Sequence, residues 1–111
     1  MSLAEPIELE PGDYRQWREA ATAHPHWLLD IREPWEREVT AIGDDHHIPM
    51  NEVPLRVGEL PMDRDIVVYC HHGVRSFQVA YYLRQQGYGA RSLSGGIARW
   101  SEEIDPSIAT Y

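Results

Sequence analysis

Short apolar runs, separated by polar segments, are the main structural signal in this chain. The clearest run covers residues 66–69, and its β-branched residues favour a strand. Residues 27–31 are apolar at nearly every position, which is typical of a strand buried on both faces. Shorter strands are expected at residues 7–9, 47–49 and 90–93.

Segments with helical spacing alternate with these runs. Helices are expected from Tyr14 to His24, from an N-cap at Asn51 to residue 57, from the end of a loop at residues 71–74 to Gly87, and at residues 97–104. Residues 32–45 are polar and indicate a loop with a helical turn near Trp35. Strands that alternate with helices predict an α/β fold with a mainly parallel central sheet flanked by helices.

The size of the chain fits one compact domain. Its 111 residues leave no room for two domains of ordinary size, and no repeat or linker divides them. We expect a single domain over residues 1–111, with a core at about 7–104 and a tail at 105–111. A hydrophobic fraction of 42% with four tryptophans indicates a globular chain rather than a disordered one.

Charge and composition exclude several classes of partner. A formal net charge of −8 disfavours binding to nucleic acid or to an anionic membrane. No apolar run approaches the roughly 20 residues that a membrane-spanning helix needs. Residues 1–9 lack the basic and apolar regions of an export signal, so a cytoplasmic location is expected. One cysteine excludes an internal disulfide framework.

That cysteine stands at the most informative place in the sequence. Cys70 directly follows the strand at 66–69, and a short loop leads from it into a helix. Ligands bind at this edge of open α/β sheets, and a loop of inward-pointing N–H groups would favour the thiolate. Gly73 supplies the conformational freedom that such a turn needs, and Arg75 adds a permanent cation. The alternative is that Cys70 is only a small buried hydrophobic residue. That alternative does not explain why a strand end, a glycine-bearing loop, an arginine and a helix start meet at this cysteine.

The histidines do not indicate a metal site. His46–His47 and His71–His72 are adjacent pairs, and neighbouring side chains in extended structure point to opposite faces. Such a spacing chelates poorly, and no second cysteine is present to assist. We therefore expect no metal, and interpret His71 and His72 as rim residues that are partly protonated near neutral pH.

Residues 70–76 (Cys-His-His-Gly-Val-Arg-Ser) resemble the active-site loop of the rhodanese family. Residues 29–36 (Leu-Asp-Ile-Arg-Glu-Pro-Trp-Glu) are similar to the first signature of that family, and residues 95–100 (Gly-Gly-Ile-Ala-Arg-Trp) to its second. The resemblance implies a rhodanese fold and transfer of sulfane sulfur through a cysteine persulfide. It also implies that Cys70 is the nucleophile and that substrate is bound by His71, His72, Gly73, Val74 and Arg75.

The first signature departs from the family pattern at three positions. Arg37 stands where an aromatic residue is usual, Ala41 where a histidine is usual and Asp44 where a glycine is usual. None of them lies in the cysteine loop, so they bear on local packing and not on the chemistry.

Several other residues are expected to support the site. Asp30 ends a buried strand at the same sheet edge as Cys70, and it can pair with Arg32 while it orients the loop. Ser76 follows Arg75 at the start of the helix and is assigned a supporting role. Glu36 is interpreted as a surface or salt-bridge residue. The aromatic residues Trp17, Tyr81, Tyr82 and Trp100 are expected in core or half-buried positions.

The reaction expected from these residues is a double displacement. The Cys70 thiolate takes sulfur from a small anionic donor such as thiosulfate, and an external thiol or an acceptor protein then removes it. No cofactor is required. A rhodanese-fold phosphatase or arsenate reductase is a rival, but its loop carries one more residue between cysteine and arginine. A non-catalytic interaction module is a second rival, and such modules typically lose the cysteine that this chain keeps.

Overall fold

The computed structural model describes residues 5–20 and 24–111. Within these ranges five strands form one sheet, in the order β1-β5-β4-β2-β3, and every pair of neighbours is parallel. The strands are β1 (Glu8–Leu9), β2 (His26–Asp30), β3 (His46–His47), β4 (Asp65–Tyr69) and β5 (Ala90–Leu93).

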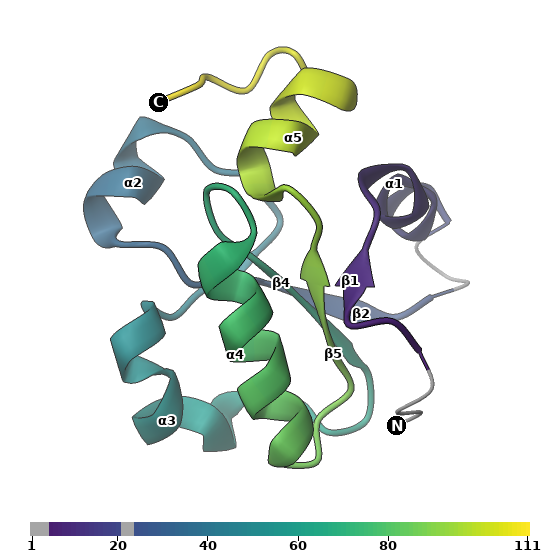
Figure 1. Cartoon of the computed structure of the whole chain (residues 1–111), viewed down its shortest axis with the longest axis vertical. Coiled ribbons are helices and arrows are strands. Elements are labelled where there is room, and N and C mark those ends of the chain that lie inside the picture. The colour runs from purple at the N-terminus through teal and green to yellow at the C-terminus, as the bar shows by residue number, and fades with distance from the viewer. Residues whose placement is uncertain (1–4, 21–23) are drawn as a thin grey trace.

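Helices cover both faces of the sheet (Figure 1). They are α1 (Pro11–Glu19), α2 (Pro34–Val39), α3 (Val53–Arg56), α4 (Val74–Gln85) and α5 (Gly96–Glu103), with 3-10 turns η1 (Met50–Glu52) and η2 (Val57–Glu59). The prediction of an α/β fold with a parallel sheet between helices is confirmed. No helix in the described ranges has the length and apolar character needed to cross a bilayer.

Alternation along β4 builds two separate cores. Ile66 and Val68 pack with residues of α3 and α4 on one face of the sheet. Val67 and Tyr69 pack on the other face with residues of α1 and α5. Because the central strand is buried on both faces, its apolar residues continue without a polar break.

Two predicted elements differ from the structure. The helix expected at 51–57 is broken into η1, α3 and η2, and Asn51 lies inside η1 instead of capping a helix. The strand expected at 47–49 is β3, which ends at His47, because Pro49 has no N–H to donate to a neighbouring strand. The first helix was expected from Tyr14 to His24; it begins at Pro11 and ends at Glu19, and residues 21–23 of the expected range lie outside the described residues.

The expected turn near Trp35 is the six-residue helix α2. A capping box begins it: the Glu33 side chain accepts from the N–H of Glu36, and the Glu36 side chain accepts from the N–H of Glu33. Pro34 at the first helical position adds a preset backbone angle. The residues of this polar segment thus favour a helix locally, although the segment offers little apolar surface.

Buried charges tie this segment to the sheet edge. Arg32 is fully buried, and its Nε and Nη2 donate to the two carboxylate oxygens of Asp30, each at 2.9 Å. Arg37 donates to Asp30 at 3.0 Å and to both oxygens of Asp45 at 2.6 and 3.0 Å. Arg37, which replaces the usual aromatic residue, is therefore an ion-pairing residue here. Asp44, which replaces the usual glycine, has φ of +54°, a conformation that glycine adopts with less strain.

A second buried carboxylate joins α2 to α4. Glu36 accepts hydrogen bonds from Arg75 Nη1 at 2.7 Å and Nη2 at 2.9 Å. Burial alone would raise the pKa of Glu36, but the hydrogen bonds from Arg75, from the Glu33 amide and from Tyr111 lower it to about 2. Glu36 was expected to be a surface or salt-bridge residue. The salt bridge is present, but the side chain is buried.

Tyr111 connects the two charged groups. The tail leaves α5 and crosses toward α2 (Figure 1), and Ser101 Oγ anchors it by donating to the carbonyl of Ile108 at 2.7 Å. The Tyr111 hydroxyl accepts from Arg32 at 3.0 Å and donates to Glu36 at 2.7 Å. Burial raises the pKa of Tyr111 to about 12, so the hydroxyl keeps its proton and continues to donate at neutral pH.

The Glu36 carboxylate should make stability depend on pH in acid. Its ordinary pKa is 4.5 and its folded pKa is about 2, so its contribution is complete above about pH 4.5 and is lost as the pH falls toward 2. We expect Glu36→Gln to lower the free energy of unfolding by about 2 kcal/mol at pH 7, and the difference from wild type to shrink below pH 4. Urea unfolding followed by tryptophan fluorescence measures both. A constant difference from pH 7 to pH 2.5 would contradict the assignment, and Glu38→Gln at an exposed position of α2 is the control at pH 7.

Loss of the Tyr111 hydroxyl should cost stability. Tyr111→Phe keeps the ring but removes an acceptor from buried Arg32 and a donor from Glu36, so we expect a loss of about 1–3 kcal/mol in the free energy of unfolding. Urea unfolding at pH 7 tests this. Tyr81→Phe, at an exposed tyrosine, should leave stability within about 0.5 kcal/mol of wild type. Equal stabilities for the two variants would show that the Tyr111 hydroxyl is not part of the buried network.

Candidate active site

Cys70 is the residue after β4, and its sulfur lies at the start of α4. Its Sγ accepts hydrogen bonds from the backbone N–H of Gly73 at 3.2 Å and of Ser76 at 3.3 Å. Both donors belong to the loop and first turn of a helix, where N–H groups lack partners within the helix. The sulfur thus sits in a cradle of backbone dipoles that favours negative charge.

Serine hydroxyls support the sulfur from the sheet side. The Cys70 thiol donates to Ser76 Oγ at 3.4 Å, and Ser76 Oγ lies 2.7 Å from Ser92 Oγ on β5. All three residues are buried. Sequence reasoning assigned Ser76 a supporting role but missed Ser92. A lone serine in the middle of an otherwise buried strand was the available signal.

Two glycines allow the chain to come close to the loop. Gly73 is the N-cap of α4 with φ of +97°, and a Cβ there would approach the backbone nitrogen of Gly95. Gly96 also has positive φ, and a Cβ on it would clash with the carbonyl oxygens of Cys70 and His71. Those carbonyls accept from the N–H groups of Ile97 at 2.9 Å and Ala98 at 3.0 Å. The glycine pair of residues 95–96 is therefore needed for α5 to hold the cysteine loop.

The two histidines of the loop lie against each other. The rings of His71 and His72 stack with centroids 3.8 Å apart, and the ring of Tyr111 stacks on His71 at 3.9 Å. The expectation that adjacent histidines diverge is wrong here, because the loop is not extended. Burial and the neighbouring His72 lower the pKa of His71. It is therefore less protonated near neutral pH than expected from the sequence.

Arg75 lies at the rim and is paired. Its side chain is 34% exposed, and both Nη atoms face Glu36. The hydrogen bonds and charge of Glu36 raise the pKa of Arg75. The structure brings Cys70, Gly73 and Ser76 together, with Arg75 and His71 beside them. The side chains of Asp30 and Arg32 bond to each other and hold the surrounding segments, so they act at a distance from the sulfur.

Hollows open on both sides of the cysteine loop. One of about 270 Å³ lies between His71–His72, α5 and the tail at residues 109–111. Another of about 320 Å³ is lined by Glu8, His72, Gly73, Val74, Phe77 and Gln78. Both hollows border the loop, and Val74 stands on the wall of the second.

Comparison with known proteins agrees with this geometry. The family model of the rhodanese-like domain matches residues 10–103. A sulfurtransferase of Allochromatium vinosum is 46% identical over 83 residues, which are 74% of this chain and 78% of that protein. The structure of a rhodanese-related protein from Thermoplasma volcanium superposes with a TM-score of 0.82 at 28% identity, and the match covers 96% of this chain and 100% of that one.

A longer protein contains a similar segment. The probable adenylyltransferase/sulfurtransferase MoeZ of Mycobacterium tuberculosis is 30% identical over 106 residues, which are 93% of this chain but 26% of that protein. The match covers about a quarter of MoeZ, so the activities of the whole MoeZ protein are not assigned to this chain. The family model, the relatives and the fold agree, and this chain belongs to the rhodanese-like domain family, whose relatives include named sulfurtransferases.

Proposed function

We propose that this chain moves sulfane sulfur from a small anionic donor to a thiol acceptor through a persulfide on Cys70. The observation that carries the proposal is the position of the sulfur. It accepts hydrogen bonds from two backbone N–H groups at the start of a twelve-residue helix. Such a cradle stabilises a thiolate before the reaction and an anionic persulfide after it.

Thiosulfate is the donor we assign. The Cys70 thiolate attacks its outer sulfur, a new S–S bond forms, and the old one breaks with its electron pair on sulfite, which leaves. The charge balances, because a thiolate and a dianion become an anionic persulfide and a dianion. No metal or organic cofactor takes part in the step.

The acceptor must be external, because the chain holds no second cysteine. An acceptor thiol attacks the outer sulfur of the persulfide and leaves with it as a new persulfide, and Cys70 departs as thiolate. In our proposal residues 7–104 are the sulfur-transfer domain and 105–111 its tail, and the reaction takes place in the cytoplasm, where thiols stay reduced.

Loop length favours sulfur transfer over phosphate transfer. Four residues, 71–74, separate Cys70 from Arg75, and two N–H groups of this small ring already point at the sulfur. From this loop length we expect a ring that fits one added sulfur and is too small for a phosphoryl group with three equatorial oxygens. The rival phosphatase assignment therefore receives no support from the geometry.

The persulfide should be visible by mass. After incubation with excess thiosulfate and rapid desalting, we expect intact-mass spectrometry to show an added mass of roughly 32 Da, one sulfur atom, that cyanide or dithiothreitol removes. Cys70→Ser should show no adduct and less than a few per cent of the wild-type thiocyanate production. Circular dichroism controls for folding of the variant. Cys70-dependent hydrolysis of p-nitrophenyl phosphate without a sulfur adduct would replace this function with the phosphatase one.

Arg75 should contribute to donor binding. Arg75→Ala removes charge-assisted hydrogen bonds at the rim, and we expect the KM for thiosulfate to rise about tenfold, which corresponds to about 1.4 kcal/mol. Steady-state kinetics of thiocyanate formation measures it. Arg56→Ala is the matched control, because Arg56 at the end of α3 also pairs with carboxylates, those of Glu52 in η1 and Glu59 in η2. An unchanged KM would assign Arg75 to the ion pair with Glu36 alone.

A further inference from the structure

The outer face of α4 carries apolar side chains that the fold leaves uncovered. Val74, Phe77 and Tyr81 are 68%, 40% and 54% exposed. They are three and four residues apart, so they form one stripe along the helix that starts at the cysteine loop. Tyr81 was expected to be at least half buried, and its exposure is a departure from that expectation. An apolar stripe of this kind marks an interaction surface.

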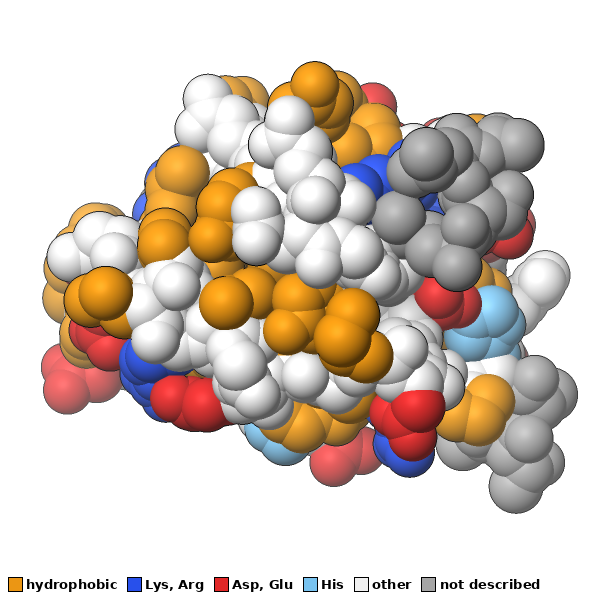
Figure 2. Space-filling view, turned by 90° about the horizontal axis from the view of Figure 1, so that it is seen from below, with side chains coloured by type: hydrophobic (Ala, Val, Ile, Leu, Met, Phe, Trp, Pro, Cys, Tyr) orange, Lys and Arg blue, Asp and Glu red, His pale blue; other side chains and the backbone are white. Residues whose placement is uncertain are grey.

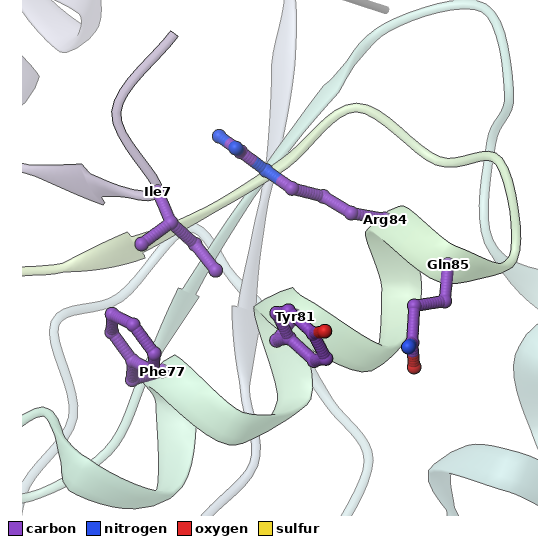
Figure 3. A pocket seen from close by; sticks show the side chains of 5 residues that line it. All are labelled: Ile7, Phe77, Tyr81, Arg84 and Gln85. Carbon is purple, nitrogen blue, oxygen red and sulfur yellow. The ribbon is translucent and has the colours of Figure 1, made fainter. Parts of the chain in front are cut away.

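A groove lies along part of this stripe, at Phe77 and Tyr81. Its volume is about 510 Å³, and its lining is Ile7, Phe77, Tyr81, Arg84 and Gln85. Figure 3 shows Phe77 and Tyr81 rising from successive turns of α4, with Ile7 and Arg84 on the other side of the hollow. Phe77 also lines the hollow that contains His72, Gly73 and Val74. Phe77 therefore stands between the groove and the hollow beside the cysteine loop.

The far end of the groove is positively charged. Arg84 donates to the carbonyls of Ala90 at 2.7 Å and of Glu5 and Pro6 at 3.0 Å each. Arg91 donates to the carbonyls of Pro6 and Glu8 at 2.9 and 3.0 Å. In the described part of the chain neither guanidinium forms an ion pair with a carboxylate, so no carboxylate side chain neutralises either positive charge.

This charge stands out from its surroundings. The chain as a whole carries −8, and the face seen from below mixes hydrophobic side chains with acidic ones (Figure 2). Burial and the neighbouring Arg91 lower the pKa of Arg84, and the opposing attraction of Glu5 is smaller. A carboxylate on a partner would relieve the repulsion between the two guanidinium groups. The groove thus combines an apolar lining with a cationic end.

We propose that this groove docks an extended segment of the sulfur-acceptor protein. The segment presents its thiol to the cysteine loop, an apolar side chain to Phe77 and Tyr81, and a carboxylate to Arg84. Val74 and Arg84 are ten residues apart, which is about 15 Å along a helix. An extended chain covers this distance with about five residues, at roughly 3.3 Å each.

The inference rests on the proposed sulfur transfer, because it names the partner of that reaction. A protein acceptor needs such a surface more than a small thiol does. The persulfide forms on a buried cysteine, and a thiol on a protein surface reaches it only when the surrounding faces fit together. A face beside the loop, apolar and with one charged end, fixes both the position and the direction of the docked segment.

A peptide of matched design tests the proposal. The probe has five residues, with cysteine first, leucine in the middle and glutamate last. We expect the sulfur-loaded protein to transfer sulfur to this peptide with a KM that rises about tenfold in Phe77→Ser or Tyr81→Ser. Transfer to 2-mercaptoethanol should be unchanged in Tyr81→Ser, because Tyr81 does not line the hollows beside the cysteine loop. Leu55→Ser, at an apolar residue of α3 that is 89% exposed, is the matched control. It should leave transfer to the peptide and to 2-mercaptoethanol unchanged.

The proposed contact between a carboxylate and Arg84 is tested by changing the charge of the peptide. Lysine in place of its glutamate should raise the KM about tenfold on wild-type protein, and the difference should fall as salt is added. Equal KM values for the glutamate and lysine peptides would overturn the proposal. So would a loss of transfer to 2-mercaptoethanol in Tyr81→Ser that equals its loss of transfer to the peptide. Concentration-dependent dimerisation that Tyr81→Ser abolishes would assign the groove to a second copy of the chain and also overturn it.

Direct binding separates this inference from the chemistry. A fluorescently labelled peptide with serine in place of cysteine cannot react, so its polarisation on unloaded protein reports docking alone. Saturable binding that weakens in Tyr81→Ser supports the groove even if no persulfide forms on Cys70. A persulfide on Cys70 together with no saturable peptide binding would overturn the docking proposal and leave the proposed sulfur transfer standing.

Discussion

The side chain of Arg32 is buried without any contact with solvent, and the edge of the sheet that carries the site depends on its hydrogen bonds. It donates to both oxygens of Asp30, to the carbonyls of Glu36 and Thr40, and to the Tyr111 hydroxyl. A buried cation that loses its partners costs several kcal/mol, so these groups must be in place together. Charge therefore holds α2 beside the cysteine loop, and in the tail it adds to the apolar packing of Ile108 and Tyr111.

The groups closest to the Cys70 sulfur are backbone dipoles and not cations. The charge of Arg75 is matched by Glu36, whose carboxylate lies within 2.9 Å of both Nη atoms. The groups that face the sulfur directly are the N–H groups of Gly73 and Ser76. Such dipoles are fixed by the fold, so in the proposed reaction they need no rearrangement when charge moves between thiolate and persulfide. An arriving anionic donor, in contrast, must compete with Glu36 for Arg75.

The sequence predicted what depends on local pattern. The runs at 27–31 and 66–69 became β2 and β4 because a strand buried on both faces has to be apolar throughout. Cys70, Gly73 and Ser76 were placed correctly, since the strand end, the loop and the helix start are close together in the chain. The partners Glu36 and Arg75 are 39 residues apart, and Arg32 and Tyr111 are 79 apart. No period or spacing marks such pairs, and the pairing of Arg37 with Asp45 was hidden in a segment interpreted as loop.

In the two proposals, one helix, α4, serves both the chemistry and the recognition of the acceptor. The first turn of α4 holds the sulfur through backbone groups, which no side-chain substitution on the outer face removes. Its inner residues Val79 and Leu83 pack in the core and keep the helix in register with the loop. Its outer residues Phe77 and Tyr81 are 40% and 54% exposed, and they are the ones available for contact with a partner. Partner choice can therefore change on this face while the position of the reactive sulfur stays constant.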